Sequence, residues 1–228
     1  MAVLEIFGTD NSVIVPTWAT ESLTSFRDWY ASDDFPEEGR ICYLAGEVYV
    51  EMGHERLSSH VNLKTALARV LDALAEKLSL GQYFGDGVRL VNEEADFSSE
   101  PDGCYVTWSS VKDGRVSLRE SNDGDDVTEL VGTPEMVLEI ISPSSVKKDK
   151  ATLRGLYHDA SIPEYWLIDA RKDQLRFEIL RSTRKGYSAT PDQDGWLPSR
   201  VFNRKFRLKR TKNPIGLWQY KVLVRPIA

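Results

Sequence analysis

The chain has 228 residues, of which 41% are hydrophobic and 28% are charged, and this composition is typical of a globular protein with a sizeable core. No apolar stretch approaches the roughly 18 to 20 residues that span a bilayer, and the N-terminus lacks the basic start of a secretory signal. Two cysteines and three histidines argue against a disulfide scaffold or a His/Cys zinc site. We expect a single cytoplasmic domain over 1–228 with no membrane partner.

The net charge of −6 hides an uneven distribution. Residues 195–228 contain nine Lys or Arg and no Asp or Glu, whereas residues 1–60 contain eleven acids and three arginines. Charge runs usually form solvated surface, and that interpretation stays open beside a contact surface for a phosphate backbone. Overall acidity does not exclude a polyanionic partner when the basic surface is local.

Apolar spacing and turn residues predict short strands and helices in alternation. In the first half of the chain they are a helix over 22–31, a hairpin over 41–52, a helix from a Ser58 or Ser59 cap to about 79, a strand over 87–92 and a strand opening at Pro101. An exposed turn-rich connection over 112–126 follows. The second half has a strand over 134–142, a helix over 144–160 capped by Ser142 or Ser144, a strand over 164–170, and antiparallel strands from 174 onwards. This order predicts an α/β fold with a mixed central sheet flanked by helices. The strands on either side of the 144–160 helix are expected to be neighbours.

Glu139 stands in the middle of the apolar run 136–141. An ionised carboxylate buried without a partner is costly, so a lone glutamate here is best explained by a register that turns it outward or by a strand edge that exposes it. Asp102 opens a nearby strand, and pairing of the two strands would bring it beside Glu139. Two carboxylates are typical ligands for Mg²⁺, and such a cation stabilises the paired charges and activates a bound water.

The helix after Glu139 begins with several charged residues: Lys147, Lys148, Asp149, Lys150 and Arg154. A helix N-terminus and basic side chains beside two carboxylates form a natural phosphate site. A lysine there would polarise the scissile phosphate or orient an attacking water. An ordinary amphipathic helix with a charged face explains the same residues, and the local pattern leaves both interpretations open.

Several motifs occur together in a characteristic order. They are Pro101-Asp102, residues 134–144 (PEMVLEIISPS), Lys148-Asp149, Leu156-Tyr157, residues 162–169 (IPEYWLID), the Gly-Glu hairpin within residues 45–52, and His60 at the start of the first long helix. Over roughly residues 40–182 the chain resembles the Uma-two family, which is grouped with restriction endonucleases of the PD-(D/E)XK superfamily.

The resemblance implies a restriction-endonuclease-like core over about 40–182, with a helix and hairpin added before it and a basic β extension over 183–228. It implies that Asp102 and Glu139 bind Mg²⁺ or Mn²⁺, helped by the backbone carbonyl of Ile140. It also implies a bacterial protein that acts on DNA as a homodimer.

The lysine that usually completes the superfamily pattern is missing at both expected places. Ile141 stands two residues after Glu139, and Leu153 stands four residues after Asp149. Lys150 is the best remaining catalytic lysine, with Arg154 next to it. We also weigh a smaller set of residues, as auxiliary groups or as DNA contacts: Glu47, His60, Asp149 and Arg154 for the first role, and Lys147, Lys148, Arg204 and Lys205 for the second.

Two hypotheses from different classes follow. The first is a Mg²⁺-dependent endonuclease that hydrolyses DNA phosphodiester bonds. The second is a catalytically degenerate nuclease fold that binds nucleic acid or protein, and the residues Ile141 and Leu153 favour it. A hydrolase of another phosphate ester would use the same residues as the first.

Overall fold

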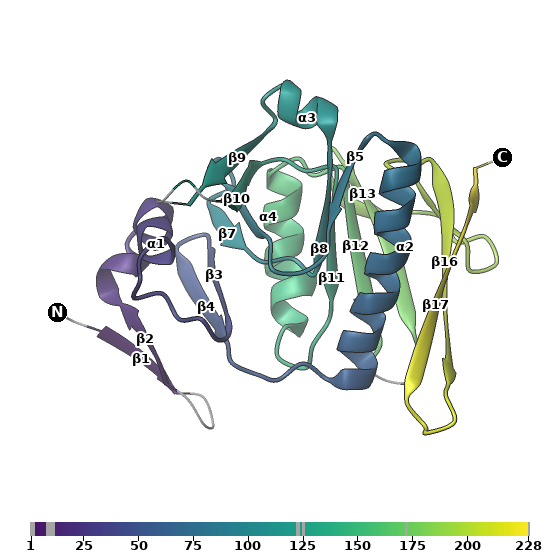
Figure 1. Cartoon of the computed structure of the whole chain (residues 1–228), viewed down its shortest axis with the longest axis horizontal. Coiled ribbons are helices and arrows are strands. Elements are labelled where there is room, and N and C mark those ends of the chain that lie inside the picture. The colour runs from purple at the N-terminus through teal and green to yellow at the C-terminus, as the bar shows by residue number, and fades with distance from the viewer. Residues whose placement is uncertain (1–2, 8–11, 122–123, 125, 172, 228) are drawn as a thin grey trace.

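The structure is a computed structural model that describes residues 3–7, 12–121, 124, 126–171 and 173–227, with the side chains of residues 3–7 and 12 left undescribed. The described strands form two six-stranded sheets, a three-stranded sheet near the C-terminus and a two-stranded N-terminal ladder. Figure 1 shows these layers side by side, with the N-terminal strands at one end of the molecule and the C-terminal hairpin at the other.

The central sheet has the strand order β14-β13-β12-β11-β8-β5. The bounds are β5 Gly81–Phe84, β8 Gly103–Thr107, β11 Met136–Ile140, β12 Glu164–Asp169, β13 Arg176–Thr183 and β14 Gly186–Ala189. Strands β11 and β12 are parallel neighbours, whereas β8 pairs with β11 in the antiparallel sense. The prediction that the strands flanking the 144–160 helix lie next to each other is therefore confirmed.

The second sheet, here called the N-terminal sheet, has the order β4-β3-β7-β6-β10-β9. Its strands are β3 Arg40–Leu44, β4 Glu47–Glu51, β6 Arg89–Asn92, β7 Phe97–Ser99, β9 Val116–Glu120 and β10 Val127–Gly132. The predicted hairpin corresponds to β3 and β4, and its turn residues Ala45 and Gly46 both have positive φ, as hairpin turns of the primed types require. The smaller sheets contain β1 Val3–Phe7 and β2 Ser12–Pro16, and β15 Leu197–Ser199, β16 Arg204–Lys212 and β17 Trp218–Pro226.

The helices are few and lie between or beside the sheets. They are η1 Thr17–Thr20, α1 Leu23–Tyr30, η2 Leu57–Val61 (a π-helical turn), α2 Asn62–Leu78, α3 Trp108–Lys112, η3 Lys148–Thr152 (a second π-helical turn) and α4 Leu153–Asp159. Ser142 caps the segment that leads into η3, because its hydroxyl accepts from the Ser145 amide and the Ser145 hydroxyl accepts from the Ser142 amide. This cap agrees with the prediction.

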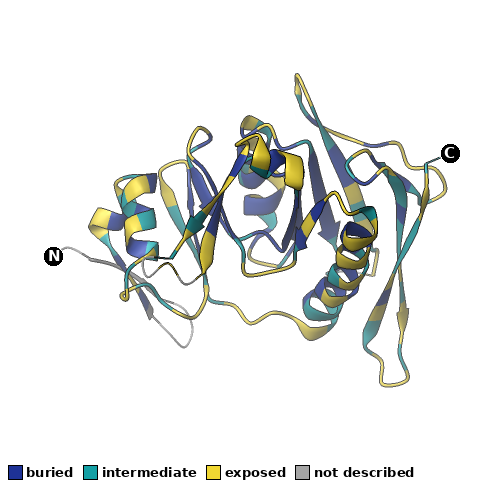
Figure 2. Cartoon of the chain, turned by 45° about the horizontal axis from the view of Figure 1, so that its top comes forward, coloured by how far each residue is buried: buried dark blue, intermediate teal, exposed yellow. Residues whose placement is uncertain are grey.

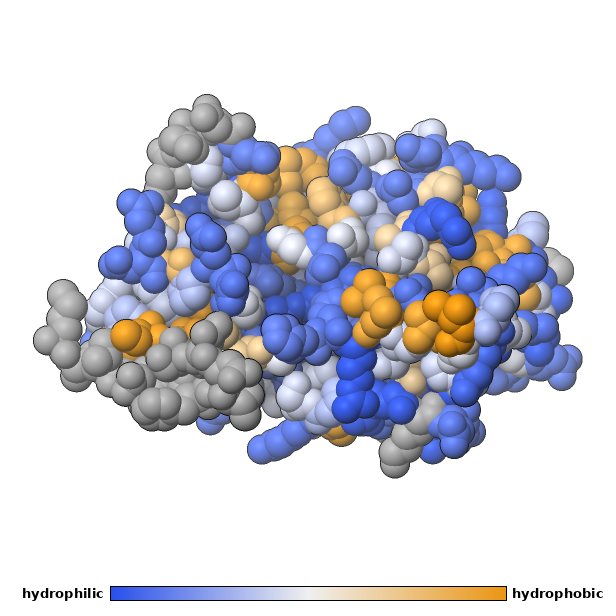
Figure 3. Space-filling view, turned by 60° about the horizontal axis from the view of Figure 1, so that its bottom comes forward, coloured by the Kyte–Doolittle hydropathy of each residue, from blue (hydrophilic) through white to orange (hydrophobic). Residues whose placement is uncertain are grey.

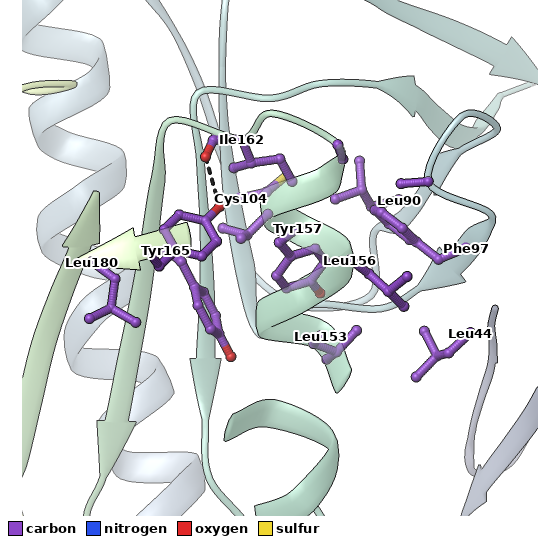
Figure 4. Packing of buried hydrophobic residues seen from close by; sticks show 14 of the residues in the cluster. Leu44, Leu90, Phe97, Cys104, Leu153, Leu156, Tyr157, Ile162, Tyr165 and Leu180 are labelled. Atoms are coloured by element: carbon purple, nitrogen blue, oxygen red, sulfur yellow. Dashed lines mark hydrogen bonds between the residues drawn. The ribbon is translucent and has the colours of Figure 1, made fainter. Parts of the chain in front are cut away.

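Both faces of the central sheet are covered, so its inner strands β8, β11 and β12 are buried almost throughout. One face packs against α2 and the C-terminal sheet through side chains such as Leu67, Trp166 and Phe206. The other face packs against α4 and the N-terminal sheet, and Figure 4 shows Tyr157, Tyr165 and their aliphatic neighbours filling that layer. Figure 2 shows the same arrangement as a buried centre with an exposed outer surface on α2. A strand buried on both faces reads as a continuous apolar run, which explains the sequence of β11.

The mixed α/β class is confirmed, but three local predictions need correction. The connection over 112–126 is not wholly turn-like, because β9 lies within it and buries Val116. The first long helical segment begins at Leu57, before either predicted cap, and Ser58 instead accepts a hydrogen bond from the backbone of Trp218. Strands β5, β7 and β10 were also missed, and of these β5 and β7 have only three or four residues, too short a pattern to detect.

Candidate active site

Asp102 and Glu139 come together at the junction of β8 and β11. Gly103 pairs with Leu138, so the next position beyond the ladder places Asp102 opposite Glu139 on the same face of the sheet. Directly opposed residues have Cβ atoms about 4.5 to 5.5 Å apart. Both side chains are buried, with 1% and 2% of their surface exposed. The predicted pairing of these two strands is confirmed.

The position after Asp102 has room only for glycine, and Gly103 occupies it. A Cβ atom built on Gly103 would lie 2.8 Å from Cζ of Tyr83 and closer still to its hydroxyl, because the Tyr83 ring packs directly on the backbone there. Any larger residue would displace this buried ring. The Pro-Asp-Gly sequence therefore fixes the backbone at the point where Asp102 enters the site.

Asp102 is surrounded by cations. Arg40 donates to its Oδ1 at 2.8 Å, and Nζ of Lys64 lies 3.4 Å from the same oxygen. Its Oδ2 accepts from the Ile140 amide at 2.7 Å. Burial opposes ionisation of Asp102, but the contact with His60 and the charges of Arg40 and Lys64 outweigh it and hold the pKa of Asp102 far below its usual range. Asp102 is therefore ionised in the folded protein.

His60 links Asp102 to the neighbouring backbone and to the loop before η2. Its Nε2 lies 3.1 Å from the Ile140 carbonyl and 3.5 Å from Oδ2 of Asp102, and its Nδ1 lies 3.3 Å from Glu55. Burial lowers the pKa of His60, but the hydrogen bond and charge of Asp102 and the charge of Glu55 raise it above the usual value. His60 is thus a buried part of the site.

Glu139 has a different environment from Asp102. Its Oε1 accepts a hydrogen bond from the Tyr157 hydroxyl at 2.7 Å. Burial, together with the nearby carboxylates of Asp149 and Asp102, raises the pKa of Glu139 well above its usual value, against the opposing charge of Lys148. The arrangement favours the protonated form of Glu139 when no further cation is present.

Two lysines reach the acidic side chains of the site: Lys64, which contacts Asp102, and Lys148, which comes from η3. Nζ of Lys148 lies 2.9 Å from Oε2 of Glu51 and 3.7 Å from Oδ1 of Asp149, and 8% of the side chain is exposed. Burial lowers the pKa of Lys148, but surrounding negative groups, Glu139 among them, raise it above the usual value. Burial raises the pKa of Asp149 to about 6, although Lys148 and a hydrogen bond from Ser145 oppose the change.

Lys150 and Arg154 have partners away from the two acids. Nζ of Lys150 lies 3.8 Å from Asp169, and 41% of this side chain is exposed. Arg154 donates to the backbone carbonyl of Tyr187. The catalytic role of Lys150 stays a prediction, whereas Lys148 is the lysine whose charge lowers the pKa of Glu139.

The remaining predicted residues are spread over the surface. Glu47 is exposed and accepts from Tyr49 two residues along the same strand. Lys147 is exposed at the start of the helical segment. Arg204 and Lys205 lie at the start of β16, where Lys205 donates to Gln193. Their DNA contacts stay predictions.

The two positions that lack the expected lysine are core positions. Ile141 is 2% exposed and Leu153 is 1% exposed, and both belong to the apolar layer between the central sheet and α4. In Figure 4 Leu153 lies beside Tyr157 within that layer. A lysine at either position would have to displace packed apolar side chains. The packing of this core therefore explains the absence of a lysine at both positions.

A cleft of about 450 Å³ opens over the site. Its lining includes Arg40, Glu55 and His60 from the Asp102 side, and the segment Ile141–Ser144 from the end of β11, with Arg171 beside it. Figure 3 views the molecule from the side of these loops, and hydrophilic residues dominate around the hollow in that face. Asp102 and Glu139 lie behind this lining, and Arg40 and His60, which both contact Asp102, separate it from the cleft.

The donor atoms fit a divalent metal of the Mg²⁺ or Mn²⁺ type. Carboxylate and carbonyl oxygens are the ligands these ions prefer, and Asp102, Glu139 and the Ile140 carbonyl supply them. The described residues also place Glu55, His60 and Asp102 with ligand atoms within 4.8 Å of one another. Since protein cations already occupy the neighbourhood of Asp102, the site is built to hold positive charge.

Sequence reasoning missed four members of this centre: Arg40, Glu51, Glu55 and Lys64. Arg40 and Glu51 lie at the two ends of the β3–β4 hairpin, and Lys64 lies on α2. The hairpin motif over 45–52 could have drawn attention to Glu51, because it was already part of the resemblance, whereas Arg40 lies before it. Lys64 looked like one more polar position on an amphipathic helix.

Comparison with known proteins places the chain in a family. The model of the Uma2 family, described as "Putative restriction endonuclease", matches residues 23–210. The chain belongs to the Uma2 family. The match confirms the resemblance deduced from the motifs, and it extends past the expected 40–182 into the basic C-terminal extension. A search of curated proteins found no relative of this Uma2 chain.

A solved structure supports the fold. A crystal structure described as a putative nuclease belonging to DUF820, from Anabaena variabilis ATCC 29413, is similar to this Uma2 protein with a TM-score of 0.56 and 18% sequence identity. The similarity covers 79% of this chain and 90% of the other. At this identity the likeness establishes a shared fold.

In the described part of the chain, no helix is both long and apolar enough to cross a membrane.

Proposed function

We propose that the protein is a divalent-metal-dependent endonuclease that hydrolyses phosphodiester bonds of DNA. The observation that carries the proposal is the pair of buried carboxylates on adjoining strands, Asp102 and Glu139, beneath an open cleft. Membership of the Uma2 family supports it. The proposal includes Mg²⁺ or Mn²⁺ as the metal, and a homodimer for the cutting of two strands.

Asp102, Glu139 and the Ile140 carbonyl would hold the metal. When bound, a divalent ion of this kind lowers the pKa of a coordinated water and neutralises charge on a phosphate. The chain itself contributes orientation. The Ile140 amide fixes Oδ2 of Asp102, and the Tyr157 hydroxyl fixes Oε1 of Glu139. Positive charge near Glu139 favours its ionised form, so a cation held there would keep Glu139 ionised.

Lys148 is the best candidate for the basic group of the site. It comes from the helical segment after β11, and its charge lowers the pKa of Glu139 although no lysine occupies position 141 or 153. From there it would stabilise negative charge that develops on the phosphate. This assignment replaces Lys150 as our preferred residue, because Lys150 is directed to Asp169.

The test is cleavage of supercoiled plasmid with Mg²⁺ or Mn²⁺ by the wild type and by Asp102→Asn and Glu139→Gln. These substitutions keep side-chain volume and remove ionisable oxygens. We expect the wild type to cleave and each variant to be slower by at least about 100-fold, the scale of a lost catalytic group. Cleavage that survives both substitutions would contradict the proposal, as would a wild type inactive with every metal tried.

A non-catalytic binding module is the second candidate. The specific observation in its favour is that Asp102 already has Arg40, Lys64 and His60 as partners, so its charge is balanced within the protein. Calorimetric titration with Mn²⁺ separates the two candidates. An endonuclease binds the ion through Asp102 and Glu139, whereas a binding module shows salt-dependent DNA binding without a specific ion.

A further inference from the structure

A second groove runs between α2 and the C-terminal sheet, with a volume of about 710 Å³. Four basic residues line it: Arg69 from α2, Lys209 and Arg210 from β16, and Lys221 from β17. Its lining contains no aspartate or glutamate. The groove is thus a concentrated basic surface on a protein whose net charge is −6.

The register of β16 and β17 places two lysines of the groove side by side. Lys209 lies directly opposite Lys221 in the β16–β17 ladder, and like charges in that position repel each other. Both lysines and Arg69 are exposed, and none of the three has an ion-pair partner among the described residues. An anion between these side chains would offset the repulsion, which the folded chain alone leaves uncompensated.

The groove is held rigidly to the active-site cleft. The Trp218 amide donates to Oγ of Ser58, and the Trp218 carbonyl accepts from Nδ2 of Asn62, so β17 is pinned to the segment that carries His60. Ser59 and His60 line the cleft, and Asn62 already lines the groove. At 1.5 Å per residue, His60 and Arg69 are separated by about 13.5 Å along the helix axis.

The indole ring of Trp218, in the β16–β17 hairpin, contacts two basic side chains. The guanidinium carbon of Arg210 lies 4.2 Å from the ring centre of Trp218, and Nζ of Lys212 lies 5.2 Å from it. These cation–π contacts hold Arg210 in place at the groove. Arg210 also donates to the Ala170 carbonyl at the end of β12, so it forms a fixed wall, while Arg69, Lys209 and Lys221 are exposed to an incoming ligand.

We infer that this groove is a binding site for the phosphate backbone of duplex DNA, on the side of the cleft towards the C-terminal sheet. The distance from His60 to Arg69 corresponds to about four base pairs, at about 3.4 Å per base pair. The choice of DNA rests on the proposed function, but the binding site does not require that the protein cleave. Contacts to phosphate position a duplex without reading its sequence.

The test measures binding of a fluorescent 30-base-pair duplex by anisotropy, in EDTA, at a series of salt concentrations. The variant is the triple substitution Arg69→Ala, Lys209→Ala and Lys221→Ala. We expect its affinity at low salt to fall by about ten-fold or more, and the slope of log affinity against log salt to decrease by about 2 to 3, since each phosphate contact contributes about 0.9. EDTA removes cleavage from the readout, so a failure of the nuclease proposal leaves this test unaffected.

A matched control removes the same charge elsewhere. Lys112, Arg184 and Lys185 are exposed and lie outside the groove. Their replacement by alanine should leave the affinity for the duplex within about two-fold of the wild type and the salt slope unchanged. The double variant Lys209→Arg and Lys221→Arg keeps the charge and should bind like the wild type, which shows that charge at these two positions, and not the lysine side chain itself, carries the binding. Equal behaviour of the groove and control variants would overturn the inference.

Discussion

The two carboxylates of the site lie side by side, yet their surroundings are opposite. Asp102 contacts Arg40, Lys64 and His60 and is held ionised. Glu139 contacts the Tyr157 hydroxyl, and its burial raises the pKa well above the usual value. Neighbouring acids whose environments push their pKa values apart are typical of active sites. The pair therefore carries about one negative charge until another cation arrives.

The largest expected difference between the two acids is in stability. Asp102→Asn removes the buried counter-ion of Arg40, Lys64 and His60, which keep only the more exposed Glu55 and Asp86 as acidic partners. The loss of one partner of a buried ion pair costs up to about 3 to 5 kcal/mol. Glu139→Gln keeps an acceptor for Tyr157 and removes a group that favours the neutral form, so its cost should stay below about 1 kcal/mol. Urea denaturation of both variants in EDTA measures the two free energies of unfolding. Equal losses would show that Glu139 is ionised and paired as strongly as Asp102.

The two lysines of η3, Lys148 and Lys150, also differ in their surroundings, and their substitution tests which of them acts on the site. Lys148→Met removes the cation beside Glu139 and should slow plasmid cleavage by about 100-fold, the scale of one lost electrostatic contact to the transition state. Lys150→Met alters an exposed pair with Asp169 and should change the rate by less than about three-fold. The reverse order of effects would restore Lys150 as the catalytic lysine.

Arg40 tests whether protein cations compete with a metal at Asp102. Arg40→Gln removes the guanidinium from Oδ1 of Asp102, so a divalent ion no longer has to approach a neutralised carboxylate. We expect Mn²⁺ to bind about ten-fold more tightly, equivalent to about 1.4 kcal/mol, and the metal-free protein to be less stable. Titration followed by electron paramagnetic resonance gives the affinity. Weaker Mn²⁺ binding in the variant would mean that Arg40 supports the metal site.

The smallest effect concerns the hydrogen bond to Glu139. Tyr157→Phe should cost about 1 kcal/mol in unfolding free energy if the acceptor is a neutral carboxyl group, and about 1.5 to 3 kcal/mol if it is charged. Tyr187→Phe is the matched control, because that hydroxyl donates to the neutral backbone carbonyl of Ile162, the bond drawn as a dashed line in Figure 4. Similar losses in the two variants support a protonated Glu139.

Much of this centre could be predicted from the sequence. The apolar run of β11 and the Pro-Asp-Gly opening of β8 identified the two strands, and the resemblance paired Asp102 with Glu139. The cap at Ser142 was also predictable, since its signal is local. These features depend on residues close together in the chain, or on a motif that covers both.

The cations were not predictable by the same reasoning. Arg40 and Lys64 reach Asp102 from 62 and 38 positions away in the sequence, and only the junction of the hairpin, α2 and β8 brings them together. The difference between Lys148 and Lys150 depends on η3, whose π-helical turn departs from the 3.6-residue period that a sequence pattern assumes. Side-chain direction at such a turn follows from the fold.

We propose above that Asp102 and Glu139 together hold a catalytic metal. The most direct measurement is a crystal structure of the wild type soaked in Mn²⁺, with anomalous scattering used to locate the ion. We predict one strong peak bound by both carboxylates and the Ile140 carbonyl, with Arg40 moved away from Oδ1 of Asp102. A map with no peak there, and with the Arg40–Asp102 contact intact at millimolar Mn²⁺, would contradict the account.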